Sequence, residues 1–324
     1  MGKRVRLCPE ITDPRLRGFL DIVPSIRRFQ DEVIREQKLT GEKIGIELLG
    51  REITVCFHRS ALEGKRPVVF ELHGGGFVLG STEKNDSICQ KICEGLGCHV
   101  IGINYRLAPE HPYPAALQDV CDVIDYFQKH EEEFHIDIDR MAVFGYSGGA
   151  TLAAATMMQS LKEKRFHLCA QVLHYPFLDS THMPDEKEHY DCDMDEEILR
   201  AFTLLYAKEE ERTNPLVSPI CATREDLEGT APTCILTAER DSLKQEGILY
   251  GELLREAGVQ VYCQVIPEVH HGYLEDAGNL SIYEEGTAQE VKQKHSPYFR
   301  DWTKAALGIS CTFLKNCFQG EKKT

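Results

Sequence analysis

From about Lys43 onward, short apolar segments typical of strands alternate with longer segments typical of helices. A chain with this alternation is expected to form a mainly parallel sheet with helices on both faces. The first two strands, Ile44–Leu49 and Glu52–His58, flank Gly50-Arg51 and are predicted to form a hairpin. The remaining strands are predicted at Pro67–His73, His99–Tyr105, Arg140–Tyr146, Leu168–His174, Thr233–Leu236 and Gln260–Ile266.

The segments between these strands have the composition and spacing of helices. They are predicted at Lys84–Gly95, Ala115–His130, Gly149–Lys164, Ser242–Ala257 and Trp302–Phe318. Gly95 and Gly258 are expected to end two of these helices, because glycine adopts the left-handed conformation at little cost. The fold class predicted is therefore α/β, with a mostly parallel sheet of eight strands flanked by helices.

Two polar segments do not follow the alternation. Residues 1–42 are helix-prone, and residues from about 179 to 214 carry charged and aromatic side chains. Insertions into an α/β sheet usually lie above the carboxyl ends of the strands, where ligands bind. We expect the two segments to pack together as a cap on one catalytic domain, residues 43–324.

Composition limits the partners of the chain. Its 324 residues carry a formal net charge of −15, which argues against a nucleic acid and against an anionic membrane surface. No stretch approaches the roughly 20 apolar residues of a membrane span, and no signal-peptide pattern follows the basic N-terminus. The 13 cysteines lack the close pairs of a zinc site and fit free thiols in a reducing compartment. We therefore expect a cytoplasmic protein without a metal.

The sequence Gly145-Tyr146-Ser147-Gly148-Gly149 lies between a predicted strand and a predicted helix. A serine nucleophile needs such a sharp turn, so that its hydroxyl meets substrate on one side and a base on the other. The flanking glycines permit the turn and keep side chains away from the hydroxyl. The alternative is a turn of small residues that only lets the helix pack on the sheet. The strand–turn–helix context favours Ser147 as a nucleophile.

The sequence HGGGF at residues 73–77 follows another predicted strand. Acyl transfer builds negative charge on the carbonyl oxygen, and backbone N–H groups aimed at that oxygen stabilise the transition state. Three successive glycines let the backbone approach a substrate without Cβ atoms in the way. We predict N–H donors at Gly75 and Gly76 and a third at Gly148. A phosphate-binding loop is the alternative, but its sequence patterns are missing.

Chain order limits the partners of the serine, because in sites of this type the acid follows the serine and the histidine comes last. The acid is expected at the end of a late strand, where both Glu239 and Asp241 lie. Asp241 is favoured because it is nearer the next helix. The base is expected after the last strand, where His270 and His271 lie, and His271 is favoured because it directly precedes a glycine and can face Ser147 from a loop.

These motifs resemble the hormone-sensitive-lipase branch of the α/β-hydrolase superfamily, the bacterial family IV carboxylesterases. The matching segments are HGGGF at 73–77, YRLAPEHPYPAALQD at 105–119, GYSGG at 145–149, NPLVSPI at 214–220, TAERDSLKQEG at 237–247 and HHGY at 270–273. They occur in the family's order and cover about residues 67–273.

The resemblance implies an α/β-hydrolase fold with a helical cap, and no cofactor. It also implies a triad and an oxyanion hole formed by Ser147, Asp241, His271, Gly75, Gly76 and Gly148. The expected activity is hydrolysis of small carboxylic esters with short to medium acyl chains. An amidase, formamidase or deacetylase on the same triad is the alternative enzyme, and a ligand receptor without catalysis is an alternative of another class. The expected partner is a small-molecule ester, and a homodimer is left open.

Four aromatic residues are candidates for the substrate pocket. They are Phe77, Tyr146, Phe202 and Tyr206. Aromatic residues in such positions are also typical of the core of a cap. Tyr146 stands where the family commonly has aspartate, and it either forms part of the pocket wall or packs internally. Residues 275–297 form a longer segment than the family pattern, and they are either an extra lid or a solvated excursion.

Overall fold

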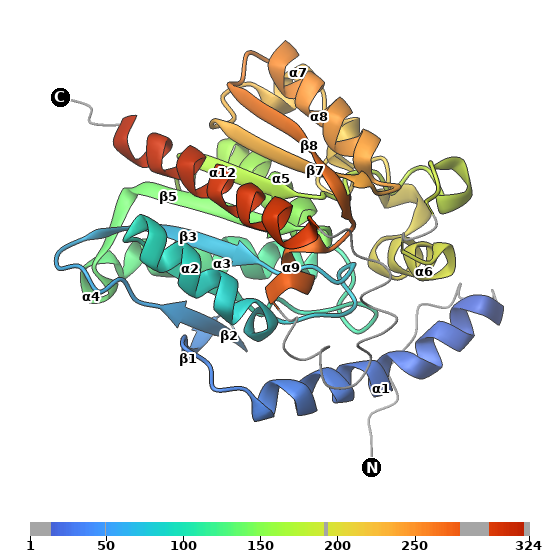
Figure 1. Cartoon of the computed structure of the whole chain (residues 1–324), viewed down its shortest axis with the longest axis horizontal. Helices are drawn as coiled ribbons and strands as arrows, with labels where there is room; N and C mark the ends of the chain where they lie inside the picture. The colour runs from blue at the N-terminus through green and yellow to red at the C-terminus, as the bar shows by residue number, and fades with distance from the viewer. Residues whose placement is uncertain (1–13, 49, 191–193, 279–297, 321–324) are drawn as a thin grey trace.

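An eight-stranded, mostly parallel sheet runs through the centre of the molecule (Figure 1). The computed structural model describes residues 14–48, 50–190, 194–278 and 298–320. The strands are β1 (Glu42–Leu48), β2 (Arg51–His58), β3 (Arg66–Leu72), β4 (His99–Ile103), β5 (Ile136–Tyr146), β6 (Ala170–His174), β7 (Thr233–Arg240) and β8 (Val261–His270). Their order is β1-β2-β4-β3-β5-β6-β7-β8, with β2 antiparallel to β1 and β4 and the other neighbours parallel. The predicted fold class is confirmed.

Helices cover both faces of this sheet (Figure 1). The α-helices of the described ranges are α1 (Pro14–Glu36), α2 (Asp86–Leu96), α3 (Ala115–Lys129), α4 (Glu131–Phe134), α5 (Gly148–Glu163), α6 (Glu196–Tyr206), α7 (Arg224–Leu227), α8 (Lys244–Glu256), α9 (Tyr273–Gly278) and α12 (Phe299–Gly320). Residues of α3, α5 and α8 belong to one apolar core, and residues of α2 and α12 belong to a second core on the opposite face. Within the described ranges, no helix has both the length and the apolar character needed to cross a membrane.

Two strands extend beyond the segments predicted from hydrophobicity. The predicted strands end at Leu236 and Ile266, but β7 and β8 continue to pair as far as Arg240 and His270, after an irregularity that follows Ala238. The last two residues of β7 are charged and exposed. Hydrophobicity therefore predicts an earlier end for this strand than its backbone pairing shows. The extension places the residues that follow β7 and β8 at the same edge of the sheet.

Helix α1 lies against α6, as expected for the two polar segments (Figure 1). Phe19 of α1 and Phe202 of α6 pack edge to face, with ring centroids 5.8 Å apart. Arg27 of α1 donates hydrogen bonds to the carbonyls of Val78 and Ala108, which joins the helix to the loops after β3 and β4. The treatment of residues 1–42 and 179–214 as a cap remains a prediction.

A buried ion pair joins the segment after β6 to α8. Lys187 Nζ lies 2.6 Å from Glu246 Oε1 and donates to the Asp179 carbonyl at 2.8 Å. Each charged side chain is 7% exposed. The other oxygen of Glu246 accepts hydrogen bonds from the N–H groups of Leu178 and Asp179. Burial raises the pKa of Glu246 to about 7, while Lys187 acts in the opposite direction.

Replacement Lys187→Met should lower the free energy of unfolding by about 3 kcal/mol at pH 8, because it leaves the Glu246 carboxylate buried without its cation. Urea unfolding followed by circular dichroism measures the change. Lys208→Met removes an exposed lysine and is the matched control, with an expected change within about 0.5 kcal/mol. Equal stability of the two variants would contradict the role given to the ion pair.

Candidate active site

Ser147 occupies a sharp turn between β5 and α5. Its backbone has φ 50° and ψ −120°, a conformation that costs a residue other than glycine about 1–3 kcal/mol. Two glycines allow the surrounding backbone to approach closely. A Cβ atom on Gly145 would lie 2.3 Å from the Gly149 oxygen, and one on Gly149 would lie 2.1 Å from the Leu72 oxygen. Neither position has room for a side chain, so both glycines are needed to hold β3, β5 and α5 in place.

The side chains of Ser147, His271 and Asp241 meet at the carboxyl edge of the sheet. His271 Nε2 lies 2.9 Å from Ser147 Oγ, and His271 Nδ1 lies 2.9 Å from Asp241 Oδ2. Because a carboxylate only accepts hydrogen bonds, Nδ1 carries a proton and Nε2 accepts from the serine hydroxyl. Asp241 is fully buried, and its other oxygen accepts from the Leu243 N–H at 2.9 Å. The structure therefore brings together the three residues that chain order selects.

The two competing residues have other partners. Glu239 accepts a hydrogen bond from the N–H of Glu268 at 2.7 Å. His270 Nδ1 lies 2.7 Å from the His271 carbonyl, and its ring stacks on Phe299 with centroids 5.5 Å apart. Asp241 and His271 are thus the acid and the base that the geometry favours.

The glycine loop after β3 lies beside the serine turn. Gly75 and Gly76 have φ angles of 110° and 57°, which glycine adopts at the least cost. A Cβ atom on Gly148 would lie 3.3 Å from the Cα atom of Gly76, so the two loops are in close contact. Among the residues that the structure describes, the N–H groups of Gly75, Gly76 and Gly148 have no hydrogen-bond acceptor. Their action as oxyanion donors remains a prediction.

The segment YRLAPEHPYPAALQD supports this loop. Tyr105 donates a hydrogen bond to the His73 carbonyl at 2.7 Å, and the two rings stack with centroids 4.2 Å apart. The Ala108 N–H donates to the Phe77 carbonyl at 2.9 Å. Burial lowers the pKa of His73 to about 4, so its ring is neutral at pH 7 and adds no charge beside the loop.

Three polar residues behind the loop, two of them buried, were not predicted. Glu275, on α9, accepts hydrogen bonds from the Gly74 N–H at 3.0 Å and from Asn85 Nδ2 at 3.4 Å. Asn85 also donates to Glu71 at 2.7 Å, and Glu71 is fully buried. The signal in the sequence was Glu71 itself, an acidic residue inside the apolar run of β3.

Three of the aromatic pocket candidates lie close to the glycine loop. Phe202 approaches it from α6, since a Cβ atom on Gly76 would lie 2.0 Å from the Phe202 ring. Phe77 belongs to the loop and stacks on Tyr206 of α6, with centroids 3.6 Å apart. All three side chains are buried. Their contact with substrate remains a prediction.

The sequence departs from the family pattern at Tyr146 and at residues 275–297. Tyr146 is fully buried, and its ring lies beside those of Phe144 and Tyr175 in the core covered by α2 and α12. Because β5 directs its side chain to that face, Tyr146 packs within this core, and its place in the pocket wall remains a prediction. Residues 275–297 were expected to form either an extra lid or a solvated excursion. Most of this segment, residues 279–297, lies outside the described ranges.

Comparison with known proteins identifies the family of the chain. The sequence profile of Abhydrolase_3, a family with the alpha/beta hydrolase fold, matches residues 69–275. Esterase LipI of Mycobacterium tuberculosis is 35% identical over 227 residues, which cover 69% of this chain and 71% of LipI. An arylesterase of Saccharolobus solfataricus is 30% identical over 269 residues, covering 76% of this chain and 87% of that protein. A solved arylesterase structure superposes with a TM-score of 0.72 at 27% identity, covering 95% of this chain and 99% of that one.

The fold and these similarities define an alpha/beta hydrolase. The chain belongs to the Abhydrolase_3 family, and its resemblance to the hormone-sensitive-lipase-like carboxylesterases is confirmed. Its class is that of the carboxylic ester hydrolases, as predicted.

Glu71 makes the stability of the protein depend on pH. Burial raises the pKa of Glu71 to about 8, although hydrogen bonds from Thr82 and Asn85 act in the opposite direction. In an unfolded chain the pKa of glutamate is about 4.3. Between these two values the folded protein keeps a proton that the unfolded chain has lost, so the free energy of unfolding falls as the pH rises.

Replacement Glu71→Gln removes this dependence. We compare the free energy of unfolding of the variant with that of the unmodified protein at each pH. The difference, variant minus unmodified protein, should be larger at pH 8 than at pH 5 by at least about 1 kcal/mol. Denaturant unfolding at both pH values measures the difference, with the exposed Glu228→Gln as control. A difference that is the same at pH 5 and pH 8 would show that Glu71 ionises normally.

Proposed function

We propose that this chain hydrolyses carboxylic esters of small molecules with short to medium acyl chains, through an acyl-enzyme on Ser147. The hydrogen-bonded series of Ser147, His271 and Asp241, with 2.9 Å for each contact, carries the proposal. His271 takes the hydroxyl proton as Ser147 Oγ attacks the ester carbonyl. Asp241 keeps the ring in the tautomer that leaves Nε2 able to accept, and it stabilises the imidazolium that forms.

The N–H groups of Gly75, Gly76 and Gly148 hold the negative charge that develops on the carbonyl oxygen. Each such donor contributes on the order of 3 kcal/mol to transition-state stabilisation. The groups belong to the backbone, so they need no rearrangement as the charge develops. The hydrogen bond from the Gly74 N–H to Glu275 supports this role, because it fixes the start of the loop.

The same imidazole completes the reaction. His271 gives its proton to the leaving alcohol, and the tetrahedral intermediate collapses to the acyl-enzyme. Water then attacks the acyl group while His271 acts again as base, and the carboxylic acid leaves as Ser147 recovers its proton.

The cysteines support the cytoplasm as the location of this activity. In the described part of the chain, eleven cysteines are free thiols, and most of them are buried. Free thiols persist in reducing compartments. The oligomeric state, including a homodimer, remains a prediction.

A series of p-nitrophenyl esters from acetate to decanoate tests the activity. The unmodified chain should prefer the shorter acyl groups and should cleave p-nitrophenyl acetate faster than the matching anilide. Ser147→Ala should lower kcat by roughly 10⁴-fold or more, because no nucleophile remains to form the acyl-enzyme. Circular dichroism checks that the variant is folded. A folded Ser147→Ala protein that retains most of its activity would mean that the nucleophile is misassigned, and faster anilide cleavage would favour an amidase.

Acyl-chain preference should depend on Phe202, whose ring lies over Gly76. Phe202→Ala opens space at the loop, so the ratio of kcat/KM for octanoate to that for acetate should increase. Leu205→Ala is the matched control, because Leu205 is also a buried apolar residue of α6. If Phe202→Ala and the unmodified chain give the same ratio, Phe202 does not contact the acyl chain of the substrate.

A further inference from the structure

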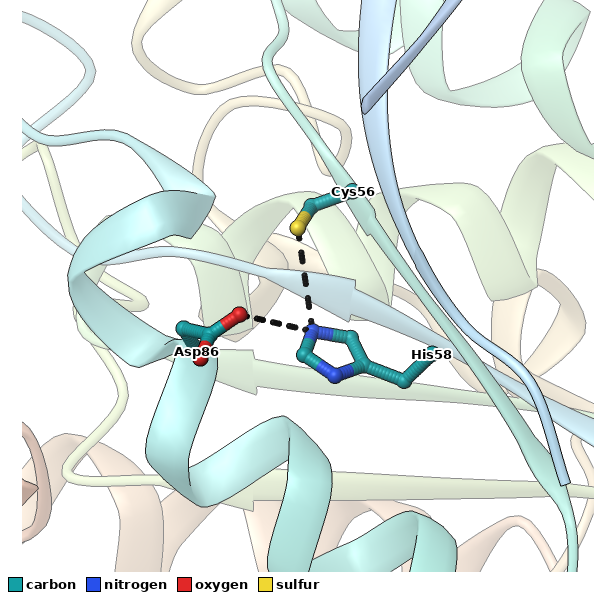
Figure 2. A group of neighbouring side chains, drawn as sticks. All are labelled: Cys56, His58 and Asp86. Atoms are coloured by element: carbon teal, nitrogen blue, oxygen red, sulfur yellow. Dashed lines mark hydrogen bonds and ion pairs between the residues drawn. The ribbon is translucent and has the colours of Figure 1, made fainter. Parts of the chain in front are cut away.

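Three side chains of types that commonly bind metals meet outside the Ser147 site (Figure 2). Cys56 and His58 lie two residues apart on β2, and Asp86 is the first residue of α2. Alternate residues of a strand face the same side, so both β2 side chains point toward α2. One ligand atom from each of the three residues lies within 4.8 Å of the other two. All three residues are buried, with exposures of 0%, 1% and 8%.

The separations suit tetrahedral coordination. Cys56 Sγ lies 3.7 Å from His58 Nε2, and that nitrogen lies 3.6 Å from Asp86 Oδ1. Zinc binds sulfur at about 2.3 Å and nitrogen or oxygen at about 2.1 Å, so neighbouring ligand atoms of a tetrahedron lie roughly 3.3–3.6 Å apart. The two separations at His58 Nε2 are already close to this spacing.

The other ring nitrogen fixes the direction of the histidine lone pair. His58 Nδ1 lies 3.3 Å from Gln90 Oε1, and Gln90 Nε2 donates to Glu94 at 2.7 Å. An amide oxygen only accepts, so Nδ1 carries the proton and Nε2 presents a lone pair to Cys56 and Asp86. Histidines that bind metals almost always donate their second N–H in this way.

Asp86 is oriented by the backbone on its other side. Its carboxylate accepts from the N–H and hydroxyl of Thr40 and from the N–H of Gly41. The Thr40 N–H contacts both oxygens, so each oxygen accepts two hydrogen bonds and the carboxylate is held in one orientation. Asp86 Oδ1 faces His58 Nε2, which cannot donate in this tautomer. In this tautomer the Cys56 S–H donates to His58 Nε2 at 3.7 Å, and a bound cation would take the place of that proton.

Gly41 packs closely against two of the ligand residues. A Cβ atom at this position would lie 2.4 Å from Cys56 Sγ and 2.7 Å from His58 Nε2. Position 41 therefore has no room for a side chain, and only glycine lets the backbone before β1 lie this close to Cys56 and His58.

We propose that Cys56, His58 and Asp86 bind one zinc ion, which ties β2 to the start of α2. Thiolate, imidazole and carboxylate together suit zinc, whereas magnesium prefers oxygen ligands alone. Zinc binds cysteine as the thiolate, so the Cys56 thiol gives up its proton when the ion binds. Binding breaks the S–H bond and forms a Zn–S bond, and one proton leaves to solvent for each ion bound.

The sequence predicted no metal, because its cysteines lack the close pairs of familiar zinc sites. The relevant pattern is Cys56-Phe57-His58, which places two ligands on one face of a strand. The third ligand comes from a helix that the hairpin meets only in the folded chain.

Titration of the full chain with ZnCl₂, after chelator treatment and removal of the chelator, tests the site. Isothermal titration calorimetry should show one strong site per chain, and the Tm should rise by about 5 °C at a zinc concentration 100 times the Kd. MgCl₂ at the same concentration should leave the Tm unchanged. Cobalt(II) should give the sulfur-to-cobalt absorption and the visible bands of a tetrahedral ion.

Matched serine variants separate this site from the other thiols. Cys56→Ser should weaken zinc binding by more than about 100-fold, since even loss of an outer hydrogen bond costs 10–100-fold. Cys121→Ser removes a thiol of α3 that is also buried, and this variant should bind zinc as the unmodified chain does. His58→Gln should lose binding too and replaces Cys56→Ser if that variant does not fold. An unmodified chain that binds no zinc at micromolar concentrations, or equal binding by Cys56→Ser and Cys121→Ser, would overturn the proposal.

Discussion

Backbone contact at the serine turn is the constraint on which the site depends. The close approach at Gly145 and Gly149 holds Ser147 at φ 50° against β3 and α5. Strain of about 1–3 kcal/mol at such a residue persists only where the surrounding structure fixes it. Because β5, β7 and β8 run in the same direction, the residues that follow β7 and β8 reach this turn from one edge of the sheet. The hydrogen bonds of His271 then join the three strand ends.

The loop opposite the serine is held from behind by polar side chains. Tyr105 bonds the His73 carbonyl, and Glu275 bonds the Gly74 N–H. Asn85 connects Glu275 with the buried Glu71, a carboxyl group that burial disfavours in its charged form. Such support leaves the N–H groups of the following glycines fixed before a substrate arrives, which is the arrangement that electrostatic stabilisation of an oxyanion requires.

Periodicity and motifs were sufficient to predict the sheet and the residues that converge on it. The strand–turn–helix context of Ser147 and the chain order of Asp241 and His271 depend on local sequence and on parallel topology, both of which are readable from one chain. Tyr146 was ambiguous because its motif position says nothing about which face of β5 it occupies. Glu275 and the Cys56–His58–Asp86 cluster could not be predicted, since they depend on contacts between elements that are distant in sequence.

Covalent labelling with a fluorophosphonate tests most directly whether Ser147 is an activated nucleophile. The reagent needs a serine that is deprotonated on attack and an oxyanion site that accepts the phosphoryl oxygen. Mass spectrometry after digestion should find one adduct per chain, on Ser147, and His271→Ala should slow its formation by orders of magnitude. Absence of labelling in the folded unmodified chain, or an adduct on another residue, would contradict the account.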